Sequence, residues 1–363
     1  MIKAKLIKKI SLFTAMVMMA GMTFSGCGQK QEVEEDNPYI EKYRQSNLIT
    51  VGFSQLGAES DWRVANTDSI KGSLTRENSI ELMFDDAQQK QDKQIIAIRN
   101  FTQQEVDCIV LAPVMETGWD TVLEEAKDAG IPVVVVDRRV DVSDDSLFTA
   151  WVGSDFKKEA RVACEWLNSF TTEKGISPKD IHIVDIQGTL GATAQIGRTN
   201  GLIEGSDKYG WQILECVPAD YAQTKAKEVM QNLLVKYSNI NVVYAENDNE
   251  AIGAIEAIEE SGKKVGTDIA SGEIMVISFD AAHSGLSKVL EGKIALDVEC
   301  NPLQGSEVLK IIKAVKNGEE IEKYTYVSES AFSCDTTVKS VTVDGEAHNI
   351  TQLTQSILDH REY

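Results

Sequence analysis

The feature that most constrains the fold of this 363-residue chain is a regular alternation of short apolar runs with helix-periodic segments, which begins near Leu48. Most of these runs are apolar throughout, which is typical of parallel strands covered by helices on both faces. We expect strands in two successive sets, at 48–55, 80–86, 106–113, 131–138 and 147–155, and then at 181–188, 211–220, 240–248, 274–280 and 294–300. The pattern predicts an α/β protein with two doubly wound parallel-sheet lobes.

The end of the chain carries too few elements for a further domain. A length of 363 residues corresponds to about two domains. A helix-like stretch at 302–316 and a strand-like stretch at 324–332 follow the second set of strands. We therefore expect these two stretches to return and complete the first two lobes.

Composition and charge exclude several classes of protein. A hydrophobic fraction of 42% is too high for a disordered chain, and six cysteines are too few for a disulfide scaffold. A net charge of −21 argues against sequence-independent nucleic-acid binding, which needs basic side chains. The cysteines after position 27 show no metal or redox spacing, so we expect buried thiols and leave one disulfide open; they are Cys108, Cys164, Cys216, Cys300 and Cys334.

The first 26 residues have the pattern of a secretory signal. Four lysines precede residue 10, and an apolar run from Ile10 to Phe24 follows them. This run is shorter than the roughly 20 residues of a membrane span. The stretch Phe24-Ser25-Gly26-Cys27 resembles the bacterial lipobox, which predicts a lipid on Cys27, a tether at 27–47 and a protein anchored to the outer face of the membrane. A plain cleaved signal is the alternative.

Polar groups recur where the predicted strands end. Ligands of open α/β sheets bind beyond the carboxyl ends of the strands. Carboxylate, amide and guanidinium groups there can each bond two adjacent hydroxyls, although an aspartate after a strand is often only a turn residue. The polar residues that follow the strands are Gln55, Asp86, Gln88, Gln89, Asp137, Arg138, Asp220, Asn247, Asp248, Asp280 and Glu299.

The chain lacks the common catalytic motifs. We find no GxGxxG after a strand and no GxxxxGK[ST], GxSxG or HExxH. The four histidines, at positions 182, 283, 348 and 360, are too scattered to suggest a metal cluster. We therefore expect binding without chemistry, with no catalytic residue, no cofactor and no metal.

The chain from about Leu48 to Phe332 resembles the type I periplasmic sugar-binding proteins of ABC transporters, the ribose-binding-like class. The resemblance is carried by VGFSQLGAESDWR, DDAQQKQDKQ, VDCIVLAPVMETGW, AGIPVVVVDR, PADYAQTKAKEVMQNLL, VYAENDNEAIGAIEAI and the aspartate of SFDA. Within the class, VGFSQLGAESDWR, DAQQKQ and APVMETGW are most similar to galactofuranose binders. Ala281 departs from the pattern, since glycine is common after that aspartate.

The resemblance implies a clamp of two lobes that closes on one monosaccharide. The first lobe would offer Glu59, Trp62, Arg63 and Gln89, with Asp137 and Arg138 as a pair that grips hydroxyls. The second lobe would offer Arg198, Tyr221, Asn247 and Asp280, with Glu299 at a crossover.

The resemblance also implies a three-segment hinge, with crossings near 150–155, 297–302 and 322–330. The expected N-terminal lobe comprises 48–152 and 301–326, and the C-terminal lobe comprises 153–300 and 327–345. Residues 346–363 would be a polar surface tail with a helix. The expected partners are a monosaccharide and a membrane permease, and the protein would act as a monomer. Presentation of bound sugar or diol to a sensor kinase or chemoreceptor is the alternative.

Overall fold

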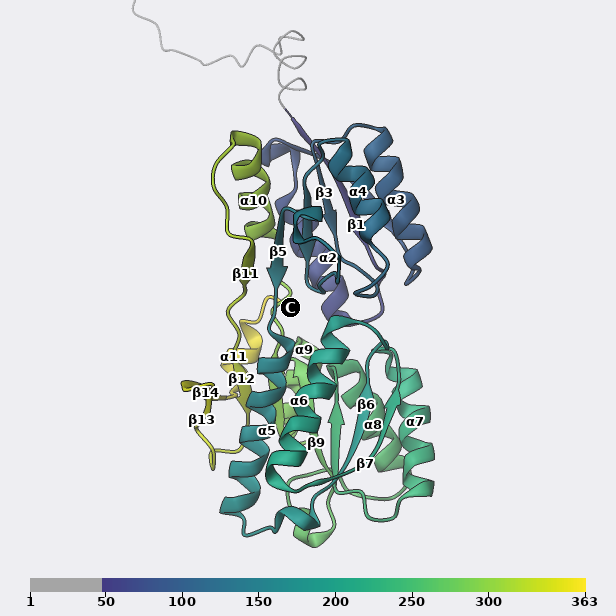
Figure 1. Ribbon diagram of the computed structural model, residues 1–363. Helices are drawn as coiled ribbons and strands as arrows, with labels where there is room; N and C mark the ends of the chain where they lie inside the picture. Colours follow the sequence, from purple (N-terminus) through teal and green to yellow (C-terminus); the bar gives the residue numbers. More distant parts are fainter. Residues whose placement is uncertain (1–47) are drawn as a thin grey trace, which may run out of the picture. The chain divides into compact units, whose positions relative to one another are not determined.

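The computed structural model describes residues 48–363, which form two α/β lobes (Figure 1). The chain from Asn47 to Tyr363 is one compact unit. The predicted signal at 1–26, the lipid site at Cys27 and the tether at 27–47 lie outside the described residues.

The first lobe is built on a six-stranded, fully parallel sheet. Its order is β11-β5-β4-β3-β1-β2, with β1 (Ile49–Gln55), β2 (Ile80–Asp86), β3 (Cys108–Leu111), β4 (Val133–Val136), β5 (Ala150–Gly153) and β11 (Tyr324–Tyr326). One core contains residues of α2 (Asp61–Ser73) and α10 (Gly305–Asn317). The other contains residues of α3 (Gln91–Gln103) and α4 (Asp120–Asp128). Both faces of the sheet are thus covered, as the apolar runs predict.

The second lobe has an eight-stranded sheet of order β13-β14-β12-β10-β9-β8-β6-β7. The strands are β6 (His182–Gln187), β7 (Gln212–Pro218), β8 (Val242–Ala245), β9 (Met275–Asp280), β10 (Leu296–Glu299), β12 (Ala331–Ser333), β13 (Ser340–Val343) and β14 (Glu346–Gln352). Neighbouring strands from β7 to β10 are parallel, whereas β12 runs antiparallel to β10.

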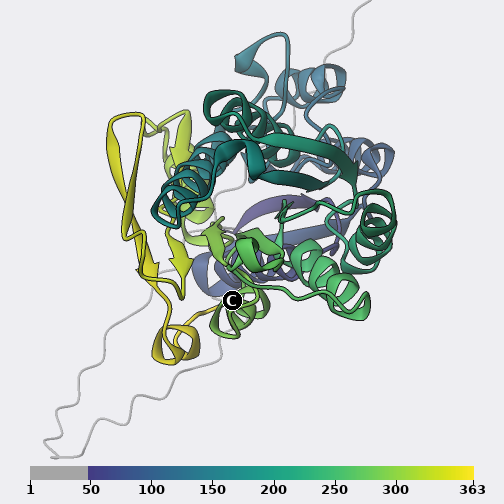
Figure 2. The same cartoon turned by 90° about the horizontal axis from the view of Figure 1, so that it is seen from below.

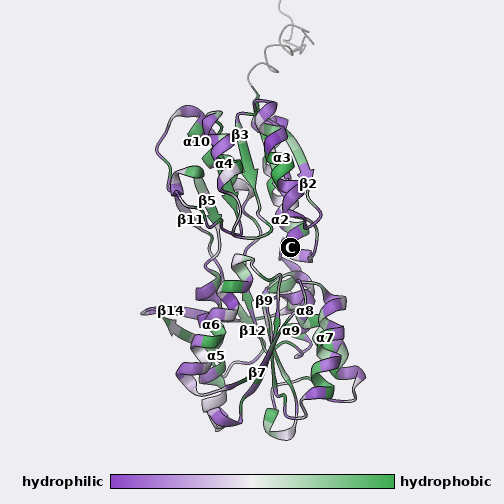
Figure 3. Ribbon diagram, turned by 45° about the vertical axis from the view of Figure 1, so that its right-hand side comes forward, coloured by the Kyte–Doolittle hydropathy of each residue, from purple (hydrophilic) through white to green (hydrophobic). Residues whose placement is uncertain are grey.

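Helices cover both faces of this second sheet as well. One core contains residues of α5 (Phe156–Glu173) and α6 (Thr193–Tyr209). The other contains residues of α7 (Gln223–Lys236), α8 (Asp248–Glu260), α9 (His283–Leu290) and α11 (Gln355–Asp359). The central strands of each lobe are mostly hydrophobic, whereas the helices carry both hydrophobic and hydrophilic residues (Figure 3).

Three crossings join the lobes. The chain passes from β5 to α5 through 154–155, from β10 to α10 through 300–304 and from β11 to β12 through 327–330. The late helix α10 and strand β11 complete the first lobe, and β12 completes the second. The predicted fold class, two doubly wound lobes with a three-segment hinge, is confirmed.

The expectation for residues 346–363 is wrong in one respect. Glu346–Gln352 is a strand, β14, which pairs in parallel with β12 and antiparallel with β13. This segment therefore belongs to the second lobe and borders one side of it (Figure 2). The signal is weak in sequence because β14 buries little besides Ile350, which is 8% exposed. Only α11 corresponds to the helix that we expected there.

Within the described residues, the five cysteines are free thiols. Cys108, Cys164 and Cys300 are buried as predicted, whereas Cys216 and Cys334 are only half-buried, against the expectation. Across residues 48–363, the helices are each too short or too polar to span a bilayer.

Candidate functional site

A pocket lies between the two lobes, at the carboxyl ends of their strands. Its lining comes from both lobes and from the crossing at Cys300, and its cavity volume is about 20 Å³. Nine of the eleven predicted site residues contribute to it. The lining residues are Glu59, Ser60, Trp62, Arg63, Asp137, Arg138, Phe156, Ala194, Arg198, Tyr221, Asn247, Asp280 and Cys300.

Unusual backbone conformations place several of these side chains. Asp137 and Tyr221 follow strands and Asp280 is the last residue of β9; their φ values are 61°, 61° and 106°. Positive φ is uncommon for residues other than glycine, and such strain clusters at functional sites because the surrounding structure holds it. Ala281, where glycine is common in the family, has a φ of 52°.

Arg63 organises the first-lobe side of the pocket. Its Nη2 donates to Asp137 Oδ2 at 2.6 Å, and its Nε donates to Glu59 Oε1 at 3.1 Å. Burial alone would lower the pKa of Arg63, but these two carboxylates raise it above its usual value. Arg63 lies in the first turn of helix α2, and Ser60 caps this helix by accepting from the Arg63 amide at 3.2 Å.

Asp137 and Arg138 both line the pocket but do not bond each other. The Arg138 guanidinium instead donates to the Val114 carbonyl at 2.8 Å and lies 3.4 Å from Glu59 Oε1. Adjacent residues at a strand end point in different directions, so the partner of Asp137 comes from α2, 74 positions away in the sequence.

Arg198 has the corresponding place in the second lobe. Its Nε donates to Glu159 Oε2 at 2.9 Å, its Nη1 to the Glu246 carbonyl at 2.5 Å, and its Nη2 lies 3.5 Å from Asp280 Oδ1. Burial raises the pKa of Asp280, and the charge of Arg198 acts against that rise. Arg198 therefore faces the pocket as a fixed cation with a carboxylate beside it.

Asn247 and Tyr221 are fixed by the start of α8. Asn247 caps this helix by accepting from the Glu250 amide at 2.8 Å, and its Nδ2 lies 3.4 Å from the Tyr221 carbonyl. The Tyr221 ring lies over Gly188, where a Cβ would be only 1.9 Å from Tyr221 Cζ. This glycine is thus required for the close approach of the ring.

Three buried polar atoms of the pocket have no hydrogen-bond partner within the protein. They are Glu59 Oε2, Arg63 Nη1 and Tyr221 Oη. Buried polar atoms are nearly always hydrogen-bonded, so unpaired ones in a pocket point to a polar ligand. Trp62 and Phe156 add aromatic surface to the lining, which suits the apolar face of a small ring.

The lobes touch on both rims of the pocket. On one rim, the Asp61 amide donates to Asn249 Oδ1 at 3.2 Å and Ser284 donates to Asp61 Oδ2 at 2.7 Å. On the other rim, the Glu116 amide donates to the Gly191 carbonyl at 3.0 Å. These contacts join the lobes on both rims, and a ligand larger than the cavity of about 20 Å³ can enter only when the lobes part.

Two predicted site residues lie outside the pocket. Gln89 is exposed on the loop after β2, and its backbone N–H donates to the Leu56 carbonyl. Glu299 is buried, but it accepts from the Ser330 amide at 2.7 Å, from Arg361 at 2.7 Å and from the Tyr363 hydroxyl. The resemblance assigned the Glu299 carboxylate to the ligand, but in the structure Arg361 and Tyr363 bond to it instead.

Sequence reasoning missed Ser60, Phe156, Ala194 and Cys300. Phe156 begins the helix after the first crossing, and Cys300 begins the second crossing. Their position could have identified Phe156 and Cys300, because residues at a crossing lie beside any pocket between two lobes.

Comparison with known proteins agrees with this geometry. Residues 51–320 match the family described as periplasmic binding protein domain. The galactofuranose-binding protein YtfQ of Escherichia coli (strain K12) is 39% identical over 293 residues, which cover 79% of this chain and 89% of that protein.

Two solved structures are similar over most of their length. One is a Mycobacterium smegmatis protein in complex with β-D-fucofuranose, with TM-score 0.74 and 41% identity, covering 78% of this chain and 91% of that chain. The other is the binding component of the arabinose ABC transporter of Shewanella sp. ANA-3, bound to L-arabinofuranose, with TM-score 0.73 and 37% identity, covering 79% and 93%.

Proposed function

Because the chain belongs to the periplasmic binding protein family, we propose that it captures a monosaccharide in furanose form, such as galactofuranose, and delivers it to the permease of an ABC importer. The observation that carries the proposal is the set of unpaired buried atoms on Glu59, Arg63 and Tyr221, which face one pocket from both lobes. All three similar proteins described above carry a furanose in their names or titles.

The proposed mechanism is hinge closure around the sugar. In the closed form, first-lobe residues such as Arg63 and Asp137 and second-lobe residues such as Arg198 and Asp280 face the same small cavity. A sugar that bonds both sets stabilises closure, because only the closed form offers both. The permease would then recognise the closed lobes.

The same site residues support binding without turnover. The carboxylates of the pocket are engaged by guanidinium groups: Asp137 by Arg63, and Asp280 by Arg198. A sugar recovered unchanged after incubation fits this proposal, and any product would contradict it. Presentation of sugar to a membrane sensor is not favoured by the relatives, of which the Bifidobacterium longum and Bacillus subtilis proteins are import binding proteins for fructose and ribose.

We also propose that the mature protein is a monomeric lipoprotein held at the outer face of the membrane through Cys27. The lipid anchor rests on the sequence of the first 27 residues, and the monomeric state rests on the family resemblance. Metabolic labelling with a radioactive fatty acid tests it: the wild-type chain should incorporate label, and Cys27→Ser should not.

Calorimetric titration tests the sugar assignment. Residues 48–363 contain both lobes and the whole pocket and can be used as a soluble form. We expect one furanose of a panel of galactofuranose, fucofuranose derivatives, arabinose, ribose, fructose and galactose to bind tightly with one-to-one stoichiometry. Failure of every sugar in the panel would leave the fold intact and overturn the proposed ligand class.

A further inference from the structure

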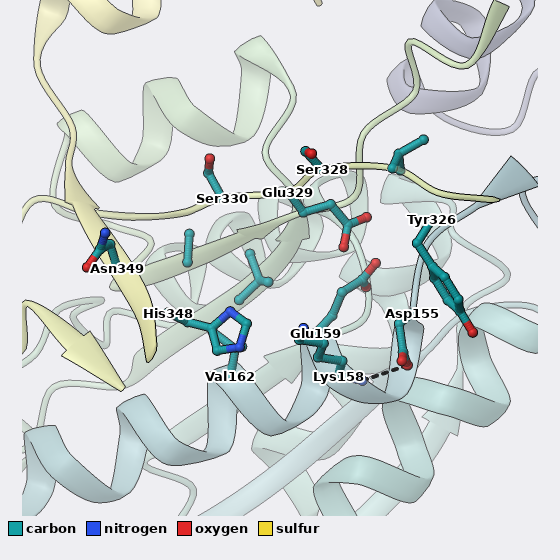
Figure 4. A pocket seen from close by; sticks show the side chains of 13 residues that line it. Asp155, Lys158, Glu159, Val162, Tyr326, Ser328, Glu329, Ser330, His348 and Asn349 are labelled. Atoms are coloured by element: carbon teal, nitrogen blue, oxygen red, sulfur yellow. Dashed lines mark hydrogen bonds between the residues drawn. The ribbon is translucent and has the colours of Figure 1, made fainter. Parts of the chain in front are cut away.

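A second, larger cavity lies on the hinge side of the molecule. Its volume is about 540 Å³, and it is lined by the first turn of α5, by the crossing at 326–331 and by His348 and Asn349 of β14. Figure 4 shows the carboxyl groups of Glu159 and Glu329 turned toward one another in this cavity. Glu159 lines this cavity and also forms an ion pair with Arg198, which lines the proposed sugar pocket.

Glu159 holds Arg198 from behind. Its side chain is 1% exposed, its Oε2 accepts from Arg198 Nε at 2.9 Å, and it does not line the interlobe pocket. Arg198 does line that pocket. The direction in which the guanidinium presents its remaining donors therefore depends on a residue that cannot touch the ligand.

Glu159 also faces the hinge. One carboxylate oxygen of Glu159, one of Glu329 and the Cys300 Sγ all lie within 4.8 Å of one another. Glu329 belongs to the third crossing and Cys300 to the second, while Ser154 of the first crossing lies 3.3 Å from the Cys300 sulfur. All three crossings thus meet at the group that orients Arg198.

The charges around this pair are unbalanced. Glu159 Oε1 and Glu329 Oε1 are buried without a hydrogen-bond partner. Burial raises the pKa of both carboxyl groups, and Arg198 opposes the rise. The other charged or titratable groups that face the pair or the cavity are Asp155, Lys158, Asp280, Cys300, Tyr326 and His348. Within the pair, Arg198 bonds Glu159 and not Glu329, so we assign the proton to Glu329.

We propose that Glu159 is the positioning residue of Arg198, and that Glu329 must carry a proton for the hinge to close with Arg198 in place. This inference rests on the proposed function, since its readout is sugar binding. An ionised Glu329 would place a second negative charge beside Glu159 in a site with one directly bonded cation, and the pair would repel across the hinge.

The sign of the pH effect follows from the raised pKa. When the crossings separate in the open form, water reaches Glu329 and its pKa returns toward the usual range. Closure then takes up a proton at any pH between the open-form and closed-form pKa values. Sugar affinity should therefore be highest at low pH within this window and fall by up to tenfold per pH unit as pH rises.

The test is calorimetric titration of the sugar ligand with residues 48–363 between pH 5.5 and 9, for wild type, Glu159→Gln and Glu329→Gln. Glu329→Gln, which imitates the protonated side chain, should keep the low-pH affinity and flatten the profile. Glu159→Gln should weaken binding at least tenfold at every pH, and Glu159→Asp should restore part of it. Glu165→Gln is the control, because it removes another α5–α6 ion pair, with Lys208 at 2.6 Å, away from the pocket.

The outcomes separate the two proposals. If the wild-type protein binds no sugar at any pH, both the proposed function and this inference are contradicted. If wild type binds, but Glu329→Gln keeps the wild-type slope or Glu159→Gln binds as tightly as Glu165→Gln, the inference alone is overturned. Near-ultraviolet circular dichroism of each variant distinguishes a loss of binding from a loss of folding. Glu329→Gln should still bind sugar, so its pH profile tests the role of Glu329 even if Glu159→Gln does not fold.

Discussion

The indole Nε1 of Trp62 donates a hydrogen bond to the backbone carbonyl of Cys300 at 2.5 Å, which ties helix α2 of the first lobe to the second crossing of the hinge. Trp62 is 4% exposed and Cys300 2%, so neither group can use water instead. The same indole lines the interlobe pocket. One side chain therefore connects the proposed ligand site to the segment that bends when the lobes move.

Replacement of Trp62 by phenylalanine should weaken sugar binding about fivefold to tenfold, which corresponds to about 1 kcal/mol for a lost hydrogen bond at a buried carbonyl. Phenylalanine keeps an aromatic ring but also removes part of the buried indole, so the effect of the lost volume needs a control. Trp119→Phe is the matched control, because Trp119 Nε1 donates to the Met115 carbonyl at 2.7 Å within the first lobe. The control should lower stability and leave affinity unchanged in the same titration; equal affinity losses would contradict the role of Trp62.

Removal of the Arg63 guanidinium should leave a buried charge. Arg63→Met strands Asp137, which is 3% exposed, and should lower the free energy of unfolding by about 3–5 kcal/mol. Adding Asp137→Asn removes the stranded charge and should recover part of this loss in urea unfolding. Sugar binding should be lost in both variants, because both side chains face the pocket. A double variant no more stable than Arg63→Met would show that the ion pair is not the cause.

The structure also predicts which glycine the pocket requires. Gly188→Ala would put a Cβ 1.9 Å from Tyr221 Cζ, so the ring must leave its place and sugar affinity should fall at least tenfold. Gly72→Ala is the contrasting variant: it lies in α2, is exposed and has no atom within 4 Å of the added Cβ. It should raise the free energy of unfolding by about 0.5–1 kcal/mol and leave affinity unchanged. If Gly188→Ala binds sugar as tightly as wild type, the position of the Tyr221 ring over Gly188 is contradicted.

Much of the architecture and the location of the site could be predicted from the sequence. Strand runs such as IPVVVVDR and IMVISFD are apolar because both sheet faces are covered, and their ends mark the edge where ligands of open α/β sheets bind. This local pattern places Asp137 at the ligand-binding edge of the first sheet, and Asn247 and Asp280 at that edge of the second sheet. That the two edges face one pocket was implied by the family resemblance and not by the strand pattern.

The pairing of side chains within the site could not be predicted. Asp137 bonds Arg63 rather than its neighbour Arg138, and Glu299 bonds the chain's last residues rather than facing the pocket. Both outcomes depend on contacts between segments distant in sequence. The positive φ of Tyr221 also gives no signal in the sequence, since a tyrosine is not a residue that favours that conformation.

Stability should depend on pH through a buried carboxyl group of the second lobe. Asp297 is fully buried; its Oδ1 accepts from the Ala281 amide at 3.0 Å, and its Oδ2 has no partner. Burial raises the pKa of Asp297 to about 7, with Asp248 beside it. The native state therefore binds more protons than the unfolded state between about pH 4 and pH 7, and the free energy of unfolding should fall as pH rises, by up to about 1.4 kcal/mol per pH unit.

Asp297→Asn keeps the acceptor for the Ala281 amide and cannot ionise. Its free energy of unfolding, measured by urea titration at pH 5, 6, 7 and 8, should fall less steeply with pH than that of wild type, so that the variant gains most at pH 8. Asp207→Asn, at an exposed position of α6, is the control and should keep the wild-type slope. The contribution of Asp185, whose pKa burial also raises to about 7, stays in every variant, so the slope should be reduced rather than abolished. Parallel profiles for Asp297→Asn and wild type would show that Asp297 is already ionised in the native protein at pH 5, against the expectation from its burial.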